Sequence, residues 1–225
     1  MCAILGSWLY LEGNYYFSTS RQSRKSNALD ISGECFLFQT HTLFRVSSRF
    51  STRRERELDD TWEFDVNSST WTIVSSAESP SPSGRAGLAL ASAENGLVYL
   101  FGGGSFDWEL ITSLEESLLY NTIIPSDDSS WVLDLSTGIW RRHLVPGDIP
   151  PPRAFAGFSS RGLSLYLFGG LGKKKKKLND LWEFDIQNSK WTLLQVENIP
   201  SARFGMTLIA RQDSLFIVGG KTWWS

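Results

Sequence analysis

Apolar and polar residues alternate along several short stretches of the chain, which is the pattern of a β-strand with one buried face. The clearest stretches are Trp62-Glu63-Phe64-Asp65-Val66 and Trp182-Glu183-Phe184-Asp185-Ile186. Turn-forming Asn and Ser residues separate each stretch from a second strand that also contains a tryptophan. Each pair of strands is therefore predicted to form a β-hairpin.

These hairpins belong to a longer unit that occurs three times along the chain. In each unit the second tryptophan follows the first by nine residues, a polar or Pro-rich link then leads to an arginine, and an apolar strand ends in a double glycine. The glycine pairs are 67 and then 50 residues apart, so the second unit carries an insertion. The anchors are Trp62, Trp71, Arg85, Gly102 and Gly103; Trp131, Trp140, Arg153, Gly169 and Gly170; and Trp182, Trp191, Arg203, Gly219 and Gly220.

Four short strands in a unit of about 50 residues, without helical periodicity, are typical of a propeller blade. The unit resembles the kelch family of β-propellers, whose marks are the double glycine after an apolar strand, the Asp-x-Trp-x-Phe-Asp strand and the second tryptophan. The fold class predicted from this resemblance is all-β, as an incomplete kelch-type β-propeller with about three and a half four-stranded blades.

The blades are placed by their anchors. Residues 1–28 form a segment without assignment, residues 29–74 a degenerate blade, residues 85–144 and 153–196 two regular blades, and residues 203–225 a partial blade. In the degenerate blade, residues 33–38 align with the strand that elsewhere precedes the double glycine. An alternative is that the apolar residues 8–11 and 15–17 supply the two strands missing from the partial blade and close a ring of four.

Composition excludes several classes of protein. The chain has 225 residues with 10 Trp, 14 Phe and 6 Tyr, but only two His and two Cys, whereas a structural zinc site takes four such ligands. We therefore predict no metal, no cofactor and no catalytic residue. The net charge of −2 gives no field that would attract nucleic acid, and no apolar run is long enough to span a membrane. The two cysteines, Cys2 and Cys35, favour a reducing compartment, and we expect the cytoplasm.

The candidate partner-binding residues are Arg85, Arg153, Arg203 and Trp108. The resemblance implies that the arginines lie near the central channel, where kelch adaptors of ubiquitin ligases use matching arginines to hold acidic peptides. The alternative is that each arginine bonds carbonyl groups or Asp side chains between blades. Trp108 lies in the longest loop and could anchor an interface. The five lysines at 173–177 form either a solvated hairpin tip or a site that attracts acidic partners.

The predicted function is a protein–protein interaction scaffold built on kelch repeats. A more specific form of this prediction is that the scaffold recognises substrates. The expected partner is another protein, which binds through an acidic peptide segment. A kelch-fold enzyme is the first alternative. Galactose oxidase, of similar fold, binds copper through two His and two Tyr, but here His41 and His143 are the only imidazoles, so the site of such an enzyme would have to lie in further blades. The second alternative is a non-functional fragment of a longer protein.

Overall fold

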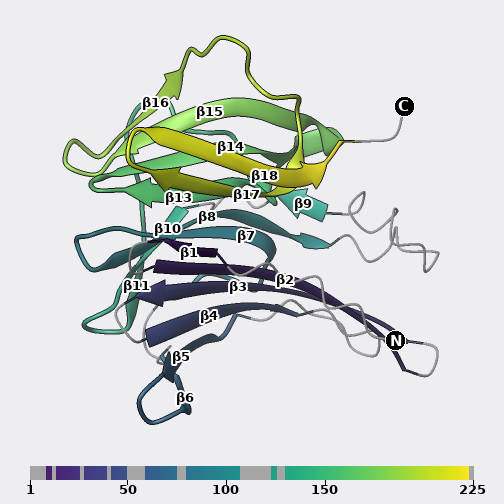
Figure 1. The fold of residues 1–225 in the computed structure, drawn as a ribbon, viewed down its shortest axis with the longest axis vertical. Coiled ribbons are helices and arrows are strands. Elements are labelled where there is room, and N and C mark those ends of the chain that lie inside the picture. Colours follow the sequence, from purple (N-terminus) through teal and green to yellow (C-terminus); the bar gives the residue numbers. More distant parts are fainter. Residues whose placement is uncertain are drawn as a thin grey trace.

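The computed structural model describes residues 9–11, 14–25, 28–39, 42–49, 59–74, 80–106, 123–125 and 130–222, with side chains from residue 59 onward, except at 106 and 123. Within these ranges there is no α-helix, and the strands form four antiparallel sheets (Figure 1). The predicted all-β class is confirmed.

The first sheet contains six strands that pair in chain order. Its last two strands form the predicted hairpin of the first unit, with Trp62 on one strand and Trp71 on the other. The strands are β1 (Leu9–Leu11), β2 (Asn14–Lys25), β3 (Ala28–Gln39), β4 (Thr42–Arg49), β5 (Thr61–Asp65) and β6 (Thr70–Ile73).

Two expectations for this region differ from the structure. Residues 33–38 lie in β3, but the strand that pairs with the Trp62 strand β5 is β4, because the β-forming run 42–49 supplies a further strand. The alternative in which residues 8–11 and 15–17 complete the last blade is wrong for the described parts of both segments. β1 pairs with β2, and β2 pairs with β3 along its whole length, so both strands extend the first sheet.

The second and third sheets are the regular blades. In each, the strand that contains the first tryptophan pairs with the strand that ends in the double glycine, as predicted. The second sheet contains β7 (Ala86–Ser92), β8 (Leu97–Phe106), β9 (Ile123–Pro125), β10 (Ser130–Asp134) and β11 (Ile139–Arg142). The third contains β12 (Arg153–Ala154), β13 (Gly157–Arg161), β14 (Ser164–Gly172), β15 (Lys177–Asp185) and β16 (Lys190–Leu194).

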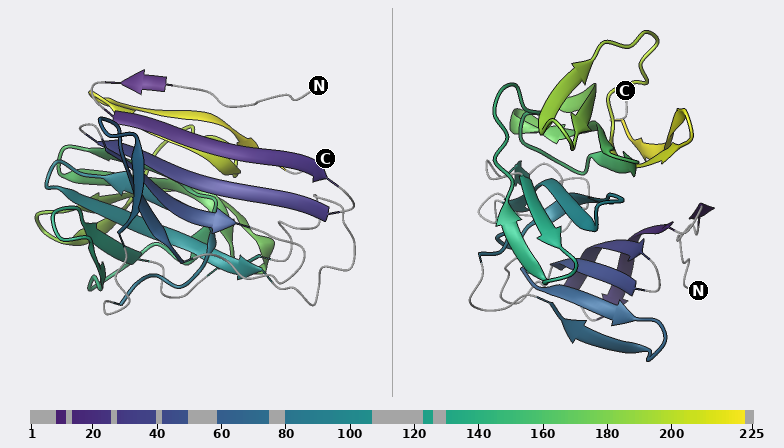
Figure 2. Two further views of the ribbon diagram at one scale, coloured as in Figure 1. Left: turned by 90° about the horizontal axis from the view of Figure 1, so that it is seen from below. Right: turned by 90° about the vertical axis from the view of Figure 1, so that its left-hand side faces the viewer.

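The fourth sheet has two strands in the described part of the chain, β17 (Phe204–Arg211) and β18 (Ser214–Lys221). The inner strand β13 packs against β7 on one side and β17 on the other, and the sheets follow one another around an arc (Figure 2, right). The first sheet and the β17–β18 pair lie at the two ends of this arc.

Aromatic and aliphatic side chains fill the spaces between neighbouring blades. Between the second and third blades, Tyr99 and Phe101 of β8 pack with Leu167, Trp182 and other side chains of the third blade. Trp131, Trp140, Trp182 and Trp191 are each at least nine-tenths buried, and the Trp140 indole donates a hydrogen bond of 3.0 Å to the Thr61 hydroxyl of the first blade. Trp71 differs, because its side chain is 42% exposed. The repeated tryptophans of the second and third blades therefore belong to the core.

Candidate functional site

The three repeated arginines make the same two hydrogen bonds in their own blades. The Nε atoms of Arg85, Arg153 and Arg203 each donate to the carbonyl oxygen two residues earlier, at 2.9, 3.0 and 3.0 Å. Each Nη1 atom donates to the carbonyl of the first glycine in the double glycine, at 3.2, 3.0 and 3.1 Å. The guanidinium group thus joins the start of the innermost strand to the end of the next strand.

The third blade adds a carboxylate to this arrangement. Asp180 accepts hydrogen bonds from Arg153 Nη1 at 2.7 Å and Nη2 at 2.8 Å, and from the Trp182 indole at 2.7 Å. Burial alone would raise the pKa of Asp180, but the hydrogen bond and charge of Arg153, with the Trp182 bond, outweigh burial and lower it. The sequence pattern alone did not identify Asp180 as the partner of Arg153, although Asp180 stands two residues before Trp182 in the repeated strand.

The other blades contain parts of this Arg–Asp–Trp arrangement. Asp60 occupies the same position before Trp62 and accepts the indole hydrogen bond at 2.5 Å, while its second oxygen, Oδ1, is buried without a donor among the described residues. In the second blade, the buried Nε1 of Trp131 has no acceptor within the described part of the chain. The residue two positions before Trp131 is Ser129, where the other two blades have aspartate.

Replacing Ser129 with aspartate is therefore expected to stabilise the chain by about 1 kcal/mol, because a carboxylate at this repeat position can accept the unsatisfied Trp131 indole hydrogen. Urea denaturation of wild type and Ser129→Asp measures the difference. The control is Ser129→Ala, which places no hydrogen-bond acceptor at the same position. Equal effects of the two substitutions would contradict the assignment.

The arginines differ in how much of each is accessible to a partner. Arg85 is 2% and Arg153 0% exposed. Both guanidinium groups donate to carbonyl groups of their own blades, and Arg153 also to the Asp180 carboxylate, whereas the alternative expected such bonds between blades. A group buried in this way presents no surface to a peptide, so we do not retain these two residues as candidates for partner binding. Arg203 is half-buried and remains a candidate. Trp108, the proposed interface anchor, lies outside the described residues.

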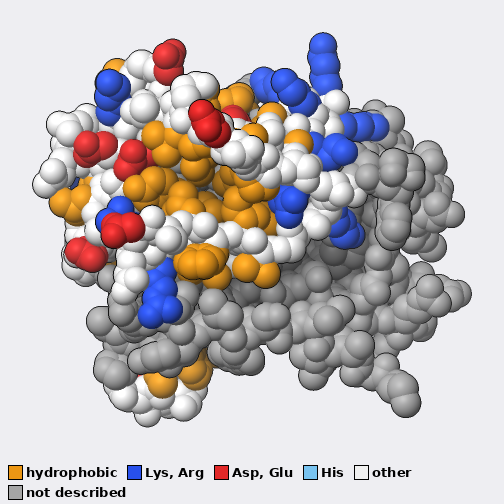
Figure 3. All heavy atoms as spheres, turned by 45° about the horizontal axis from the view of Figure 1, so that its top comes forward, with side chains coloured by type: hydrophobic (Ala, Val, Ile, Leu, Met, Phe, Trp, Pro, Cys, Tyr) orange, Lys and Arg blue, Asp and Glu red, His pale blue; other side chains and the backbone are white. Residues whose placement is uncertain are grey.

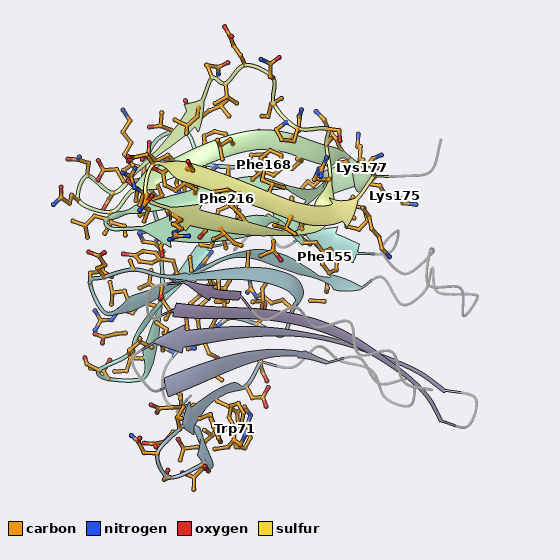
Figure 4. All side chains as sticks on the ribbon, in the orientation of Figure 1. Trp71, Phe155, Phe168, Lys175, Lys177 and Phe216 are labelled. Carbon is orange, nitrogen blue, oxygen red and sulfur yellow. The ribbon has the colours of Figure 1, made fainter. Side chains whose placement is uncertain are left out.

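The lysine segment forms the tip of the hairpin between β14 and β15. Lys173–Lys175 make a 3-10 turn in which Lys174 and Lys175 have positive φ angles of 54° and 62°. The side chains of Lys174, Lys175 and Lys176 are exposed, and none of the three forms an ion pair within the described residues. Figure 4 shows Lys175 and Lys177 at the end of the blade where β18 also ends. The exposed lysines therefore lie on the rim where β14 and β18 end, next to their double glycines.

The ring of His143 lies among aromatic side chains of the second and third blades. It meets Phe184 edge-on at 5.0 Å and Tyr99 at 5.6 Å, and burial lowers the pKa of the imidazole. His143 is thus a packing residue of the blade interface.

Among the described residues no group of three or more His, Cys, Asp or Glu could hold a metal ion. No helix in the described part of the chain is long and apolar enough to cross a membrane.

Comparison with known proteins gives the same architecture. Residues 115–224 match the family model described as the KLHDC2/KLHL20/DRC7 Kelch-repeats domain. These residues are kelch repeats. A solved structure titled "Structure of YjhT" superposes on 98% of this chain and 73% of that chain with a TM-score of 0.61. Because the sequence identity is only 16%, this similarity shows a shared kelch-type fold and carries no statement about function.

Several curated proteins are similar in sequence. Host cell factor of Drosophila melanogaster is 24% identical over 220 residues, which is 93% of this chain and 13% of that protein. Host cell factor homolog hcf-1 of Caenorhabditis elegans is 27% identical over 165 residues, or 70% of this chain and 19% of that protein. Acyl-CoA-binding domain-containing protein 5 of Arabidopsis thaliana is 29% identical over 169 residues, which is 72% of this chain and 23% of that protein. The kelch chain spans less than a quarter of the length of these relatives.

Proposed function

We propose that this kelch chain is a protein-interaction scaffold without enzymatic activity, and that the rim carrying the lysine hairpin binds an acidic segment of another protein. The observation that carries the proposal is the exposed group Lys174, Lys175 and Lys176, which projects from a well-packed blade without ion pairs in the described part of the chain. Loops on a rigid framework are a common place for recognition sites.

The framework beneath the hairpin supports this role. Leu171, at the end of β14, is 1% exposed, and the backbone N–H of Gly172 bonds the Lys176 carbonyl at 2.8 Å. The hairpin is therefore held at its base while its ammonium groups remain in solvent. Three neighbouring cations that repel one another are stabilised by any carboxylate that approaches, so an acidic peptide gains from all three at once.

An acidic peptide fits better than a nucleic acid. The whole chain has a net charge of −2, and a nucleic acid would meet repulsion beyond the hairpin, whereas a short acidic segment can engage the lysine tip alone. The scarcity of cysteine supports a reducing compartment such as the cytoplasm, which remains our prediction for the location of the protein. Substrate recognition for a larger assembly is the more specific form of this proposal.

Neutralising the hairpin is expected to weaken binding of an acidic peptide about tenfold, because three exposed ion pairs contribute about 0.5 kcal/mol each. The variant combines Lys174→Gln, Lys175→Gln and Lys176→Gln. The probe is a fluorescein-labelled synthetic peptide of alternating Glu and Ser, and fluorescence anisotropy at low salt gives its dissociation constant.

The matched control removes three exposed cations from the opposite rim with Arg161→Gln, Lys190→Gln and Arg211→Gln. These residues lie at the turns that join β13 to β14, β15 to β16, and β17 to β18. The control is expected to bind the peptide nearly as tightly as wild type. An equal loss in both variants would mean that the peptide responds only to overall charge, and the assignment of the rim would then be wrong.

A further inference from the structure

A serine stands two residues before the repeated arginine in two of the three links that lead into the blades. Ser83 precedes Arg85, and Ser201 precedes Arg203. In both links the arginine Nη2 donates a hydrogen bond to the serine hydroxyl, at 3.1 and 2.9 Å. Both serines are nevertheless exposed. Each hydroxyl is therefore held against a guanidinium group and still faces solvent.

The third blade shows that the same guanidinium nitrogen can hold an anionic oxygen. Its link has Pro151 in place of the two serines, and Pro151 is exposed as they are. There the Nη2 of Arg153 donates to a carboxylate oxygen of Asp180 at 2.8 Å. A phosphate group on the serine would offer anionic oxygens to this nitrogen, and arginine binds phosphate as well as it binds carboxylate.

Ser201 lies at the base of the lysine hairpin. The backbone of Arg203 bonds both strands that the hairpin joins, because its N–H donates to the Leu178 carbonyl at 3.1 Å and its carbonyl accepts from the Gly170 N–H at 2.9 Å. Figure 3 shows Lys and Arg side chains gathered at the end of the molecule that carries the hairpin, with Asp and Glu side chains gathered toward the other end. A phosphate on Ser201 would thus enter a cationic surface.

The link that contains Ser201 is accessible to an enzyme. Residues 195–203 have no regular secondary structure, so they can extend into a kinase without the loss of strand pairing. An arginine follows two residues after the serine, and further cations lie on the same rim. Kinases that select basic surroundings for their substrate serine fit this segment.

We propose that Ser201 is a phosphorylation site for a basophilic protein kinase, and that its phosphate is held by Arg203 and weakens the binding of acidic segments at this rim. The second part rests on the proposed function of the lysine hairpin. In the reaction the Ser201 hydroxyl oxygen bonds to the γ-phosphorus of ATP, and the bond from that phosphorus to the oxygen bridging to the β-phosphate breaks. ADP leaves, and the hydroxyl proton passes to the catalytic base of the kinase.

The first test treats the full chain with ATP, Mg²⁺ and a kinase that selects arginine two residues after the serine, and maps the phosphate by tandem mass spectrometry. We expect phosphate on Ser201. The variant Ser201→Ala should lose this phosphate, whereas Ser83→Ala, the matched change in the other link, should keep it. Phosphate on other residues with Ser201 unmodified would overturn the proposal.

The second test asks whether Arg203 holds the phosphate, with phosphoserine incorporated at position 201 during translation. The second pKa of phosphoserine is ordinarily about 6, and a paired guanidinium group favours the dianion. Titration followed by phosphorus NMR should therefore give a pKa at least about half a pH unit lower in the folded chain than in a phosphopeptide of residues 197–205, which has the same neighbours but is unfolded. Arg203→Gln should remove the difference. Equal pKa values in the wild-type chain and the peptide would overturn the pairing, and this comparison does not depend on the folding of Arg203→Gln.

The third test measures the Glu–Ser peptide by fluorescence anisotropy. Phosphoserine at position 201 is expected to weaken its binding about fivefold, because the dianion cancels most of the charge of the three exposed lysines. Phosphoserine at position 189, in the exposed turn between β15 and β16 on the opposite rim, adds the same charge and should change binding little. Equal binding by the unmodified chain and the chain phosphorylated at 201 would overturn the regulation. If the unmodified chain does not bind the peptide at all, the proposed function fails instead, and the first two tests still decide whether Ser201 is the modification site.

Discussion

Replacing Gly102 with alanine is expected to destabilise the chain by about 4 kcal/mol or more, whereas Gly219→Ala costs about 1 to 2 kcal/mol. Both glycines have a φ of +72°, so the backbone strain of an added side chain is the same at the two positions. They differ in surroundings. A Cβ atom on Gly102 would lie 2.1 Å from the carbonyl oxygen of Arg153 in the next blade, while no described atom lies within 4 Å of a Cβ on Gly219.

The difference between the two variants therefore measures how closely successive blades approach at the double glycine. Urea denaturation followed by tryptophan fluorescence gives both free energies of unfolding. Because Gly219 controls for strain and for loss of chain flexibility, the excess cost at Gly102 belongs to the contact with Arg153. Equal costs at the two positions would show that the blades are not packed as described.

Removing the carboxylate with Asp180→Ala is expected to cost about 3 to 5 kcal/mol, because Arg153 is fully buried and would keep its charge without a counterion. The matched control is Asp213→Ala, which breaks the Arg161–Asp213 ion pair. Those two side chains are 48% and 90% exposed, so the loss should stay below about 1 kcal/mol. Urea denaturation of both variants at neutral pH makes the comparison.

The same pair predicts a dependence on pH. The pKa of Asp180 in the folded chain is lowered from the ordinary value of 3.8, so the unfolded chain binds the proton more readily. The stabilisation is fully present above the unfolded pKa and is lost as the pH falls through the lower pKa of the folded state. The gap between wild type and Asp180→Ala should therefore narrow below about pH 4. A gap that stays constant down to pH 2.5 would contradict the ion pair.

The regular parts of the fold could be predicted because local pattern and packing require the same residues there. Trp182 and Phe184 alternate with polar residues, and both are buried on one face of β15. Gly102 and Gly169, the first glycines of two of the pairs, mark places where a Cβ atom would lie within 3 Å of the backbone of the next blade. Spacing alone was thus enough to assign β8, β10, β14 and β15 and their pairing.

Other features depend on contacts between distant residues, which spacing does not show. β4 has no double glycine, so nothing in the repeat marks it as the neighbour of β5. The resemblance to kelch adaptors suggested a ligand for Arg153, but whether a guanidinium group faces a channel or a carboxylate 27 residues away is decided by the fold. The exposure of Phe216 and Val218 is likewise a property of the assembled sheets, since the same positions are buried in β8.

Amide hydrogen exchange of the full chain, with and without a saturating amount of the Glu–Ser peptide, shows directly which rim binds an acidic partner. If the lysine hairpin is the binding surface, exchange slows over residues 172–178 and changes little at the opposite turns near residues 162 and 188. Protection confined to those opposite turns, with residues 172–178 unchanged, would contradict it.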